Sequence, residues 1–304
     1  MLKKILVTGS SGTIGTRLCE KLIQEGFEIS CVDIAPNKWN KEVNSRTFLF
    51  DLRKKDFFDV LPSFDLVVHL AANARVYNLV VDPSLSLDNV ITTYNVLEFC
   101  RKKGVKKILF ASSREIYGNA ETEKRKEIDV KIDDCESPYT ASKISGEAFV
   151  RSYHKCYGLD FIITRFSNVY GMYDESDRVI PLFIRNSLEG KDLLVFGKDK
   201  KLDFTYIDDT ISGLIVLIKN FDNVKNQSYN IASGEAHTIL EVAEFIKKLT
   251  NSKSKIKFSN NRKGEVIKFV ADISKAKSIG YSPKTTFEEG LKLSVNWYVN
   301  ALKK

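Results

Sequence analysis

The stretch that decides the fold is Thr8-Gly9-Ser10-Ser11-Gly12-Thr13-Ile14-Gly15. It follows an apolar run at 5–7, which predicts a strand, and it opens a helical stretch over 14–25. Glycines at this junction let the backbone turn tightly and approach a pyrophosphate, which the amides of the helix N-terminus then bind. We therefore expect a dinucleotide cofactor at this turn.

The acid that such a site requires is Asp33, which ends the second predicted strand, 28–32. A carboxylate at this point accepts hydrogen bonds from the ribose hydroxyls of adenosine and repels a 2′-phosphate. The next residues, Ile34-Ala35-Pro36, contain no arginine that would receive such a phosphate. The sequence therefore predicts NAD rather than NADP.

Short apolar strands alternate with amphipathic helices over the first half of the chain. Further strands are predicted over 47–50, 66–70, 107–110 and 161–164, and further helices over 85–103 and 139–157. Strands that are apolar throughout predict an α/β fold with a doubly wound parallel sheet, covered on both faces, that binds ligands at the carboxyl ends of its strands.

The pattern loosens after about residue 170. Predicted helices over 179–188, 211–219, 239–249 and 287–302 are separated by loops and short strands. We expect an NAD-binding domain over 1–170, to which some later strands and helices return. The remainder, 171–304, is expected to form mainly a smaller α/β lobe that faces the substrate.

The composition excludes several classes of protein. With 43% apolar and 28% charged residues in 304, the chain is not expected to be disordered. Five dispersed cysteines without a CxxC pair indicate a reducing compartment. The longest apolar run, 214–218, is far below the roughly 20 residues of a membrane span. We expect a cytoplasmic protein without a membrane partner, and no cluster of ligands has the spacing of a metal site.

The net charge of +8 is concentrated in the last part of the sequence. Residues 251–304 contain 12 basic and 4 acidic side chains, a surplus as large as that of the whole chain. Lys253, Lys255 and Lys257 alternate along the chain, so that in a strand they would share one face, which we expect to be exposed to solvent. The surplus is interpreted mainly as solubilising charge, and no nucleic-acid partner is expected.

The segment Tyr139-Thr140-Ala141-Ser142-Lys143 places a phenol and an ammonium on one face of a predicted helix. A free tyrosine, with a pKa near 10, is a poor base at neutral pH. The ammonium, together with the cationic nicotinamide of NAD+, is expected to lower the pKa of Tyr139. Tyr139 can then accept the proton of a substrate hydroxyl while the carbon gives hydride to NAD+, and Lys143 would also hold the nicotinamide ribose.

Taken in order along essentially the whole chain, these motifs resemble those of the extended short-chain dehydrogenase/reductase family, which contains nucleotide-sugar epimerases and dehydratases. The GxxGxxG spacing of the glycine turn is part of this resemblance. It implies a Rossmann-type fold that binds NAD and a nucleotide-diphosphate sugar. The cofactor-binding residues implied are Gly9, Gly12, Thr13, Ile14, Gly15, Asp33, Asp51, Leu52, Leu70, Ala71, Ala72, Asn89, Tyr139 and Lys143.

The resemblance also implies a third catalytic group after the strand at 107–110. By its distance from Tyr117-Gly118, Ser113 matches the family's serine or threonine that hydrogen-bonds the reacting hydroxyl, and Ser112 is the alternative. The candidate catalytic residues are Ser113, Tyr139, Lys143 and, as a supporting group, Glu115.

The two residues after Ser113 discriminate among the reactions of the family. The 4,6-dehydratases have an Asp-Glu pair at this point, whereas this chain has Arg114-Glu115 and lacks the acid. The glucuronate decarboxylases keep the glutamate and add an arginine at the position of Leu202. The resemblance therefore favours a 4-epimerase of the UDP-glucose/galactose or UDP-uronate type, an isomerase that works through a 4-keto intermediate with tightly bound NAD+. A dehydratase, a decarboxylase, a C4 oxidoreductase and a non-catalytic NAD-binding sensor remain alternatives.

On the substrate side, the resemblance assigns one role to each of several residues. These are Asn168 and Arg262 for the diphosphate, Glu265 for the nucleotide ribose, and Val179 in the stretch that closes over the nucleotide. We also hypothesise that Arg114 recognises the carboxylate of a uronate. Many epimerases use an arginine at the position of Leu202 on the diphosphate, so Lys200, Lys201 or Arg185 is expected to compensate. The resemblance also implies a homodimer, because in this family the helices that match 85–103 and 139–157 commonly pair with those of a second subunit.

Overall fold

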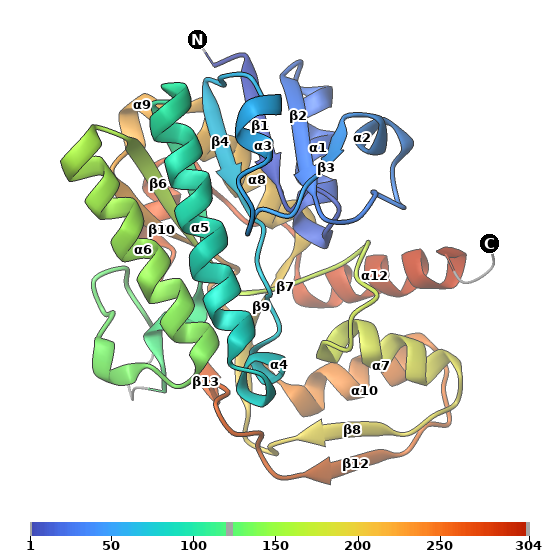
Figure 1. Cartoon of the computed structure of the whole chain (residues 1–304). Coiled ribbons are helices and arrows are strands. Elements are labelled where there is room, and N and C mark those ends of the chain that lie inside the picture. The colour runs from blue at the N-terminus through green and yellow to red at the C-terminus, as the bar shows by residue number, and fades with distance from the viewer. Residues whose placement is uncertain (1, 120–123, 302–304) are drawn as a thin grey trace.

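The computed structural model describes residues 2–119 and 124–301 (Figure 1). Its centre is a parallel sheet of seven strands in the order β10-β6-β5-β4-β1-β2-β3. Their bounds are β1 Lys4–Thr8, β2 Glu28–Asp33, β3 Thr47–Leu49, β4 Leu66–His69, β5 Lys107–Ser113, β6 Asp160–Phe166 and β10 Gln227–Ile231. The doubly wound α/β fold expected from the sequence is confirmed.

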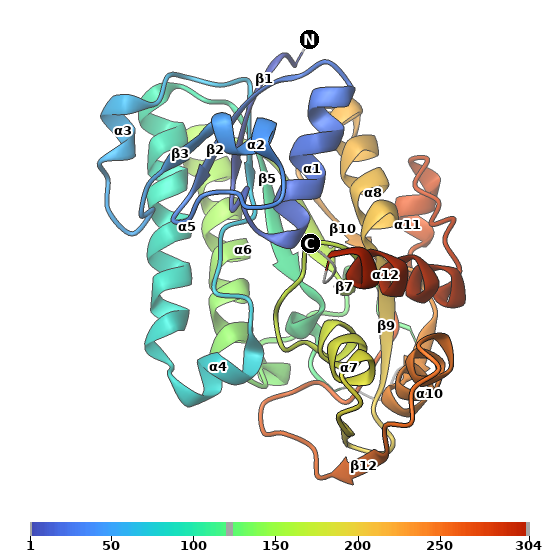
Figure 2. The same cartoon turned by 90° about the vertical axis from the view of Figure 1, so that its right-hand side faces the viewer.

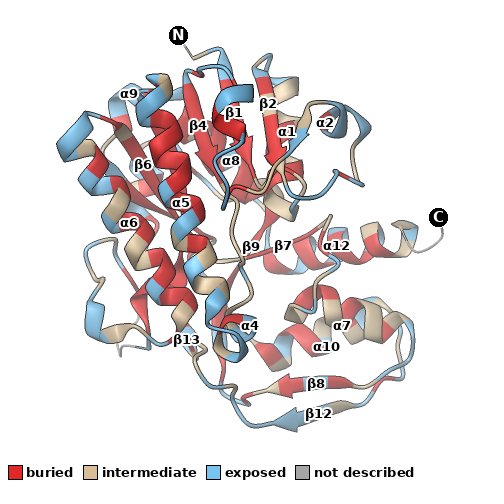
Figure 3. Cartoon of the chain, viewed as in Figure 1, coloured by how far each residue is buried: buried red, intermediate tan, exposed pale blue. Residues whose placement is uncertain are grey.

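Helices cover the sheet on both faces (Figure 2). One face is covered by α5 (Ser84–Lys103) and α6 (Pro138–Tyr157), and the other by α1 (Thr13–Gln24) and α8 (Ile207–Lys219). Successive strand residues point to opposite faces, so Ile5 and Val7 pack in the cluster that contains α1, whereas Leu6 packs in the cluster that contains α5. All three are buried, which explains why these strands are apolar throughout (Figure 3).

The seven-stranded sheet and the helices that cover it are called the sheet layer below, and several short elements belong to it. They are α2 (Lys41–Ser45), α3 (Phe57–Val60), α4 (Val76–Val81), α9 (Phe221–Val224), α11 (Ser274–Ser278) and two 3-10 turns, η1 (Arg114–Tyr117) and η2 (Ile132–Asp134). The strand order reverses at β1, which lies between β2 and β4. Loops from the carboxyl ends of β1 and β4 diverge there, which makes this edge the place where open parallel sheets bind ligands.

A smaller lobe lies below this edge in Figure 1. Its elements are β7 Asn168–Tyr170, β8 Leu193–Phe196, β9 Lys201–Tyr206, β11 Ala236–Thr238, β12 Ile256–Ser259, β13 Lys268–Phe269, α7 Val179–Leu188, α10 Ile239–Leu249 and α12 Phe287–Ala301. Strand β9 pairs with β7, β11 and β13, and β8 pairs with β12. Four elements from beyond residue 170, α8, α9, β10 and α11, belong to the sheet layer rather than to this lobe.

The predicted helices and strands are all present and differ from the prediction only at their ends, whereas the short helices α2, α3, α4, α9 and α11 were not predicted. Helix α8 begins at Ile207, four residues before the predicted start, and Ile207 is already buried in the core. The end predicted for the last helix, Leu302, lies outside the described residues. Lys253, Lys255 and Lys257 are exposed as expected, although only Lys257 belongs to strand β12. Within the described ranges, none of the helices has the length and apolar character needed to cross a membrane.

Candidate active site

A cavity of about 990 Å³ opens between the sheet edge and the lobe. It is lined by residues from both parts of the chain. Every residue proposed for cofactor binding, substrate binding or catalysis contributes to its wall, apart from two of the cations expected to compensate for Leu202. The fold thus brings together positions that are up to 256 residues apart, Gly9 and Glu265.

The glycine turn fits a pyrophosphate. Gly9 has a φ of 72°, and a Cβ there would lie 2.7 Å from the backbone nitrogen of Ala71. A Cβ on Gly15 would overlap the carbonyl of Gly9. Helix α1 begins after Gly12, and no side chain caps its amides, which lie beside the cavity. These features leave uncapped helix amides where a diphosphate can approach the backbone closely.

The other predicted cofactor residues lie along the same wall. Asp33 accepts hydrogen bonds from the amides of Ser11, at 2.9 Å, and Ala35, at 3.2 Å, which fixes its carboxylate at the end of β2. Asp51 is paired with Arg53 at 2.7 Å, and this interaction lowers the pKa of Asp51. The residue set therefore fits a dinucleotide, with a carboxylate at the point expected for a ribose.

Tyr139 and Lys143 lie one turn apart on α6, and both are buried. The helix starts there because Ser137 caps it and Pro138 occupies its first position. The Lys143 ammonium donates a hydrogen bond of 2.8 Å to the carbonyl oxygen of Ala111. Burial lowers the pKa of Lys143 to about 8.

The pKa of Tyr139 differs from the sequence expectation. Burial raises it to about 12, and this effect outweighs the interaction with Ser113 and the positive charges of Arg178 and Arg114, which lower it. In the chain without its cofactor, the neighbouring ammonium therefore does not suffice to lower the phenol pKa. Of the two candidate serines, Ser113 is the one that interacts with Tyr139. The Ser112 hydroxyl is buried and has no hydrogen-bond partner in the described part of the chain.

Arg114 and Glu115 form a buried ion pair with an Nη2–Oε1 distance of 2.7 Å. The same guanidinium nitrogen lies 3.3 Å from Oδ1 of Asn168, whose Nδ2 donates to the carbonyl of Asp203 at 2.9 Å. Burial raises the pKa of Glu115, and Arg114 opposes this rise. The two charges thus neutralise each other within the cavity wall, while Nη1 of Arg114 and Oε2 of Glu115 have no hydrogen-bond partner among the described residues.

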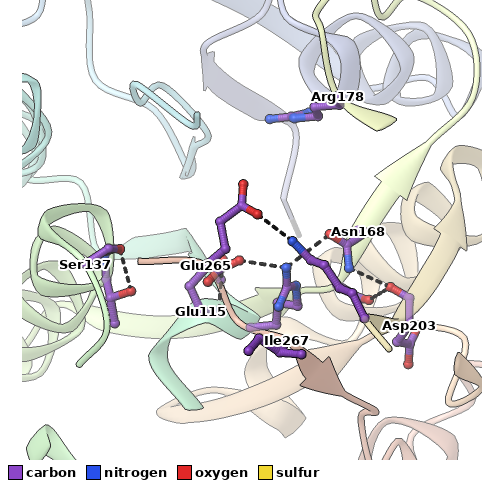
Figure 4. Close-up of polar contacts among 12 residues, drawn as sticks. Glu115, Ser137, Asn168, Arg178, Asp203, Glu265 and Ile267 are labelled. Carbon is purple, nitrogen blue, oxygen red and sulfur yellow. Dashed lines mark hydrogen bonds and ion pairs between the residues drawn. The ribbon is translucent and has the colours of Figure 1, made fainter. Parts of the chain in front are cut away.

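A second ion pair lies next to the first. Lys200 donates to Glu265 at 2.6 Å, so that Glu265, proposed for a ribose, is held by a cation (Figure 4). In the same view, Arg178 stands apart from the group that contains Glu115, Asn168 and Glu265.

Arg262 is held between two aromatic rings. Its guanidinium carbon lies 4.0 Å from the ring centroid of Phe196 and 4.9 Å from that of Tyr77. Leu202 lines the cavity from β9 and is almost fully buried, so the arginine that many epimerases place there is replaced by an apolar side chain.

Of the three cations expected to compensate for Leu202, Lys200 lines the cavity. Lys201 and Arg185 are not among the lining residues, and Arg185 donates to the carbonyl of Ser176 at 2.5 Å.

Sequence reasoning missed several lining residues that carry charge or an aromatic ring. They include Lys38, Arg53, Arg75, Tyr77, Arg178 and Phe196. The sequence contained a signal for two of them, because they lie close to stretches already assigned to the site. Arg178 directly precedes Val179, and Arg75 follows the run 69–72 at the end of β4. The aromatic pair around Arg262 had none, because it joins three distant segments. Among the described residues, no group of three His, Cys, Asp or Glu side chains could hold a metal ion.

Comparisons with known proteins agree with this geometry. A model described as "NAD dependent epimerase/dehydratase family" matches residues 5–232. The chain is 34% identical over 312 residues to the UDP-glucuronate 4-epimerase of Thermodesulfobacterium geofontis, with 96% of this chain and 95% of that protein covered.

Two solved structures are similar over nearly the whole chain. The UDP-glucose 4-epimerase of Thermus thermophilus, in complex with NAD, has a TM-score of 0.90 at 30% identity, with 98% of this chain and 99% of that one covered. The UDP-glucose 4-epimerase of Thermotoga maritima, with UDP-glucose, has a TM-score of 0.88 at 30% identity and the same coverage.

Proposed function

This chain belongs to the NAD-dependent epimerase/dehydratase family, and from that premise we propose that it is a nucleotide-sugar 4-epimerase. Its substrate is a sugar linked to a nucleoside diphosphate, and a neutral hexose such as that of UDP-glucose or UDP-galactose fits the site best. The reaction is an isomerisation with no net redox change.

The uncapped N-terminus of α1 would hold the pyrophosphate of NAD, and Asp33 would hold an adenosine ribose. When bound, NAD+ supplies the acceptor and later the donor of one hydride, and it brings a positive charge next to the phenol. Asp33 excludes a 2′-phosphate because its carboxylate would face that group.

Tyr139 is the proton carrier. Its Oη takes the proton from the reacting hydroxyl and returns it, while Ser113 orients that hydroxyl. Lys143, fixed by the carbonyl of Ala111, holds positive charge beneath the phenol. Because burial has already removed water from the phenol, added positive charge acts on it in a medium of low dielectric constant.

The observation that supports an epimerase over a dehydratase is the ion pair between Arg114 and Glu115. Elimination of water needs an acid and a base near the same carbons. A guanidinium does not release its proton in proteins, so Arg114 cannot serve as the acid. Oxidation at one carbon followed by return of the hydride needs only the proton carrier Tyr139.

The same pair argues for a neutral sugar over a uronate. Arg114 is only 6% exposed, and its charge is already matched by Glu115. A substrate carboxylate at this point would meet the Glu115 carboxylate as well as the guanidinium. Leu202 argues against decarboxylation, because an apolar side chain cannot pair with the departing carboxylate.

The test is incubation of the purified protein with UDP-, dTDP-, GDP- and CDP-sugars, including UDP-glucuronate, with the products identified by NMR and absorbance followed at the NADH wavelength. Conversion of one sugar to its C4 epimer without a lasting absorbance change is expected. Accumulation of NADH or a keto-sugar would point to an oxidoreductase, and loss of water or CO₂ to a dehydratase or decarboxylase. Bound NAD without any conversion would support a sensor.

We also propose a homodimer formed through α5 and α6. Leu87 and Ile91 on α5 are 63% and 43% exposed, and Tyr94 on the same helix is 36% exposed. Side chains of this kind on neighbouring turns form an apolar strip that a second copy can cover. Sedimentation equilibrium distinguishes dimer from monomer, and a monomeric protein with full activity would refute this assembly.

A further inference from the structure

Three further arginines line the same cavity: Arg75, Arg178 and Arg262. Arg75 directly precedes α4 and Arg178 directly precedes α7, and both helices lie in the lower half of the molecule (Figure 1). The two residues are linked through the backbone, because Nη2 of Arg178 lies 3.3 Å from the carbonyl oxygen of Ala74. The ring of Tyr77 meanwhile packs on Arg262. Arg178 and Arg262 therefore both contact the 74–77 segment, which contains Arg75.

These arginines are incompletely neutralised. Arg75 is paired with Asp177, whose side chain is 62% exposed, and Arg178 lies 3.7 Å from Asp174. Within the described residues, Arg262 forms no ion pair and is held by aromatic rings instead. Burial lowers the pKa of Arg75, and the charges of Arg178 and Arg262 lower it further. The cluster is thus a concentration of positive charge that an anion would stabilise.

We propose that Arg75 and Arg178, together with Arg262, bind the diphosphate of the nucleotide sugar and take the place of the cation that Leu202 does not supply. This inference rests on the proposed function, since it assigns the phosphate end of the same substrate. A guanidinium fork can bind two phosphate oxygens at once, which an exposed carboxylate such as Asp177 does not prevent. Arg75 exchanges Asp177 for the phosphate when the substrate enters.

The position of the cluster favours the substrate over the cofactor as the source of the diphosphate. The pyrophosphate of NAD has its own site at the uncapped N-terminus of α1. Arg178 acts on the phenol of Tyr139, and Arg262 packs on Phe196 of β8 in the lobe. The arginines therefore lie between the reacting end of the cavity and the lobe. Since Arg75 belongs to the sheet layer and Arg178 to the lobe, a diphosphate between them also ties the two parts together.

The experiment compares the binding of UDP, uridine and NAD to the full chain and to Arg75→Met, Arg178→Met and the double variant. Hydrogen bonds to charged groups are worth about 1.5–3 kcal/mol, so each single variant should weaken UDP binding by about 10- to 100-fold, and the double variant further. Uridine should bind within about twofold of its original affinity because it has no phosphate. NAD should do the same because its pyrophosphate binds at the N-terminus of α1 in the proposed function. The UDP affinity of Arg178→Lys should lie between those of the unmodified chain and Arg178→Met, since lysine keeps the positive charge but lacks the guanidinium fork.

Arg46→Met is the matched control, because Arg46 pairs with Glu42 on α2 and does not line the cavity. Unchanged UDP binding in the double variant would overturn the proposal. An equal loss for UDP and uridine would show a general effect on the lobe, and a loss confined to NAD would assign the arginines to the cofactor; either result also overturns it. Failure of the unmodified chain to bind UDP or any other nucleoside diphosphate would instead count against the proposed function.

Discussion

The ammonium of Lys143 donates a 2.8 Å hydrogen bond to the carbonyl oxygen of Ala111 and thereby ties α6 to the end of β5. Ala111 lies two residues before Ser113, so this bond sets the distance between the two elements that carry the proposed catalytic groups. The ammonium is fully buried, and its pKa is lowered to about 8. A buried charge of this kind has an energetic consequence that can be measured.

Lys143→Met should make the protein inactive and slightly more stable at pH 7. A shift of the Lys143 pKa from 10.5 to about 8 corresponds to about 3 kcal/mol that folding loses by burying the ammonium. The lost hydrogen bond to Ala111 offsets about 1–2 kcal/mol of this gain. We expect a higher melting temperature and turnover reduced by at least about 100-fold.

The stability difference between Lys143→Met and the unmodified protein should depend on pH. Between pH 8 and 10.5 the unfolded chain binds a proton at Lys143 that the folded chain lacks, so the unfolding free energy rises with pH in this window. The advantage of Lys143→Met should therefore be present at pH 7 and disappear above pH 10.5. Melting curves at several pH values check this, and a variant less stable at pH 7 would show that the lysine is not strained by burial.

Tyr139→Phe should lower turnover by about 1,000-fold while NAD remains bound. The substitution removes only the hydroxyl that carries the proton, and the ring that lines the cavity stays. Tyr157→Phe, at the exposed end of the same helix, is the control and should keep full activity. Product analysis with the preferred sugar gives the answer, and retained turnover would remove Tyr139 as the proton carrier.

Gly12→Ala and Gly15→Ala should separate cofactor binding from folding. Gly12 has a φ of −75°, and its Cβ would lie 3.4 Å from the carbonyl of Gly9, so alanine is tolerated by the fold. The methyl group would nevertheless occupy the approach of the pyrophosphate, and NAD affinity should fall by about tenfold or more. A Gly12→Ala protein with unchanged NAD affinity would place the pyrophosphate elsewhere.

In Gly15→Ala, by contrast, the added methyl group overlaps the carbonyl of Gly9. Overpacking of this kind destabilises folding by about 1–3 kcal/mol, so this variant should melt earlier even without NAD. Thermal melting with and without NAD distinguishes the two variants. Equal melting temperatures without NAD would show that the turn relaxes around the extra methyl group.

Arg165→Met should destabilise the protein by about 3–5 kcal/mol, because it leaves the Glu147 carboxylate buried without its partner. The Arg165–Glu147 distance is 2.8 Å, and both side chains are less than 10% exposed. The double variant Arg165→Met/Glu147→Leu should recover most of this loss. Arg151→Met, whose arginine is 44% exposed and 3.9 Å from Glu147, should change stability by less than about 1 kcal/mol. Denaturant unfolding of the three variants measures these changes in the free energy of unfolding.

The enzyme should discriminate between neutral and acidic sugars. Because Arg114 is already paired with Glu115, UDP-glucose or UDP-galactose should be converted faster than UDP-glucuronate. The measurement is kcat/KM for each sugar under identical conditions. A clear preference for the uronate would restore the hypothesis that Arg114 receives its carboxylate.

Much of the site could be predicted because its residues follow strands or open helices. The turn from Gly9 to Gly15 and the acid at Asp33 follow from local backbone requirements, and Tyr139 and Lys143 follow from helical spacing. All of them line one cavity. The contribution of Arg75 to that cavity was not predicted, because no local pattern relates it to Arg178, 103 residues further along the chain.

The sequence by itself determined the order of strands and helices, the dinucleotide turn and the spacing of the proton carrier and its ammonium, because these depend on backbone geometry within a few residues. Tertiary structure alone decided the charge state of the site. Burial raises the pKa of Tyr139 to about 12 and lowers that of Lys143 to about 8. It also pairs Arg114 with Glu115 and gathers arginines from two layers around one cavity. Desolvation and Coulomb interactions depend on which distant segments surround a group, and no stretch of sequence contains that information.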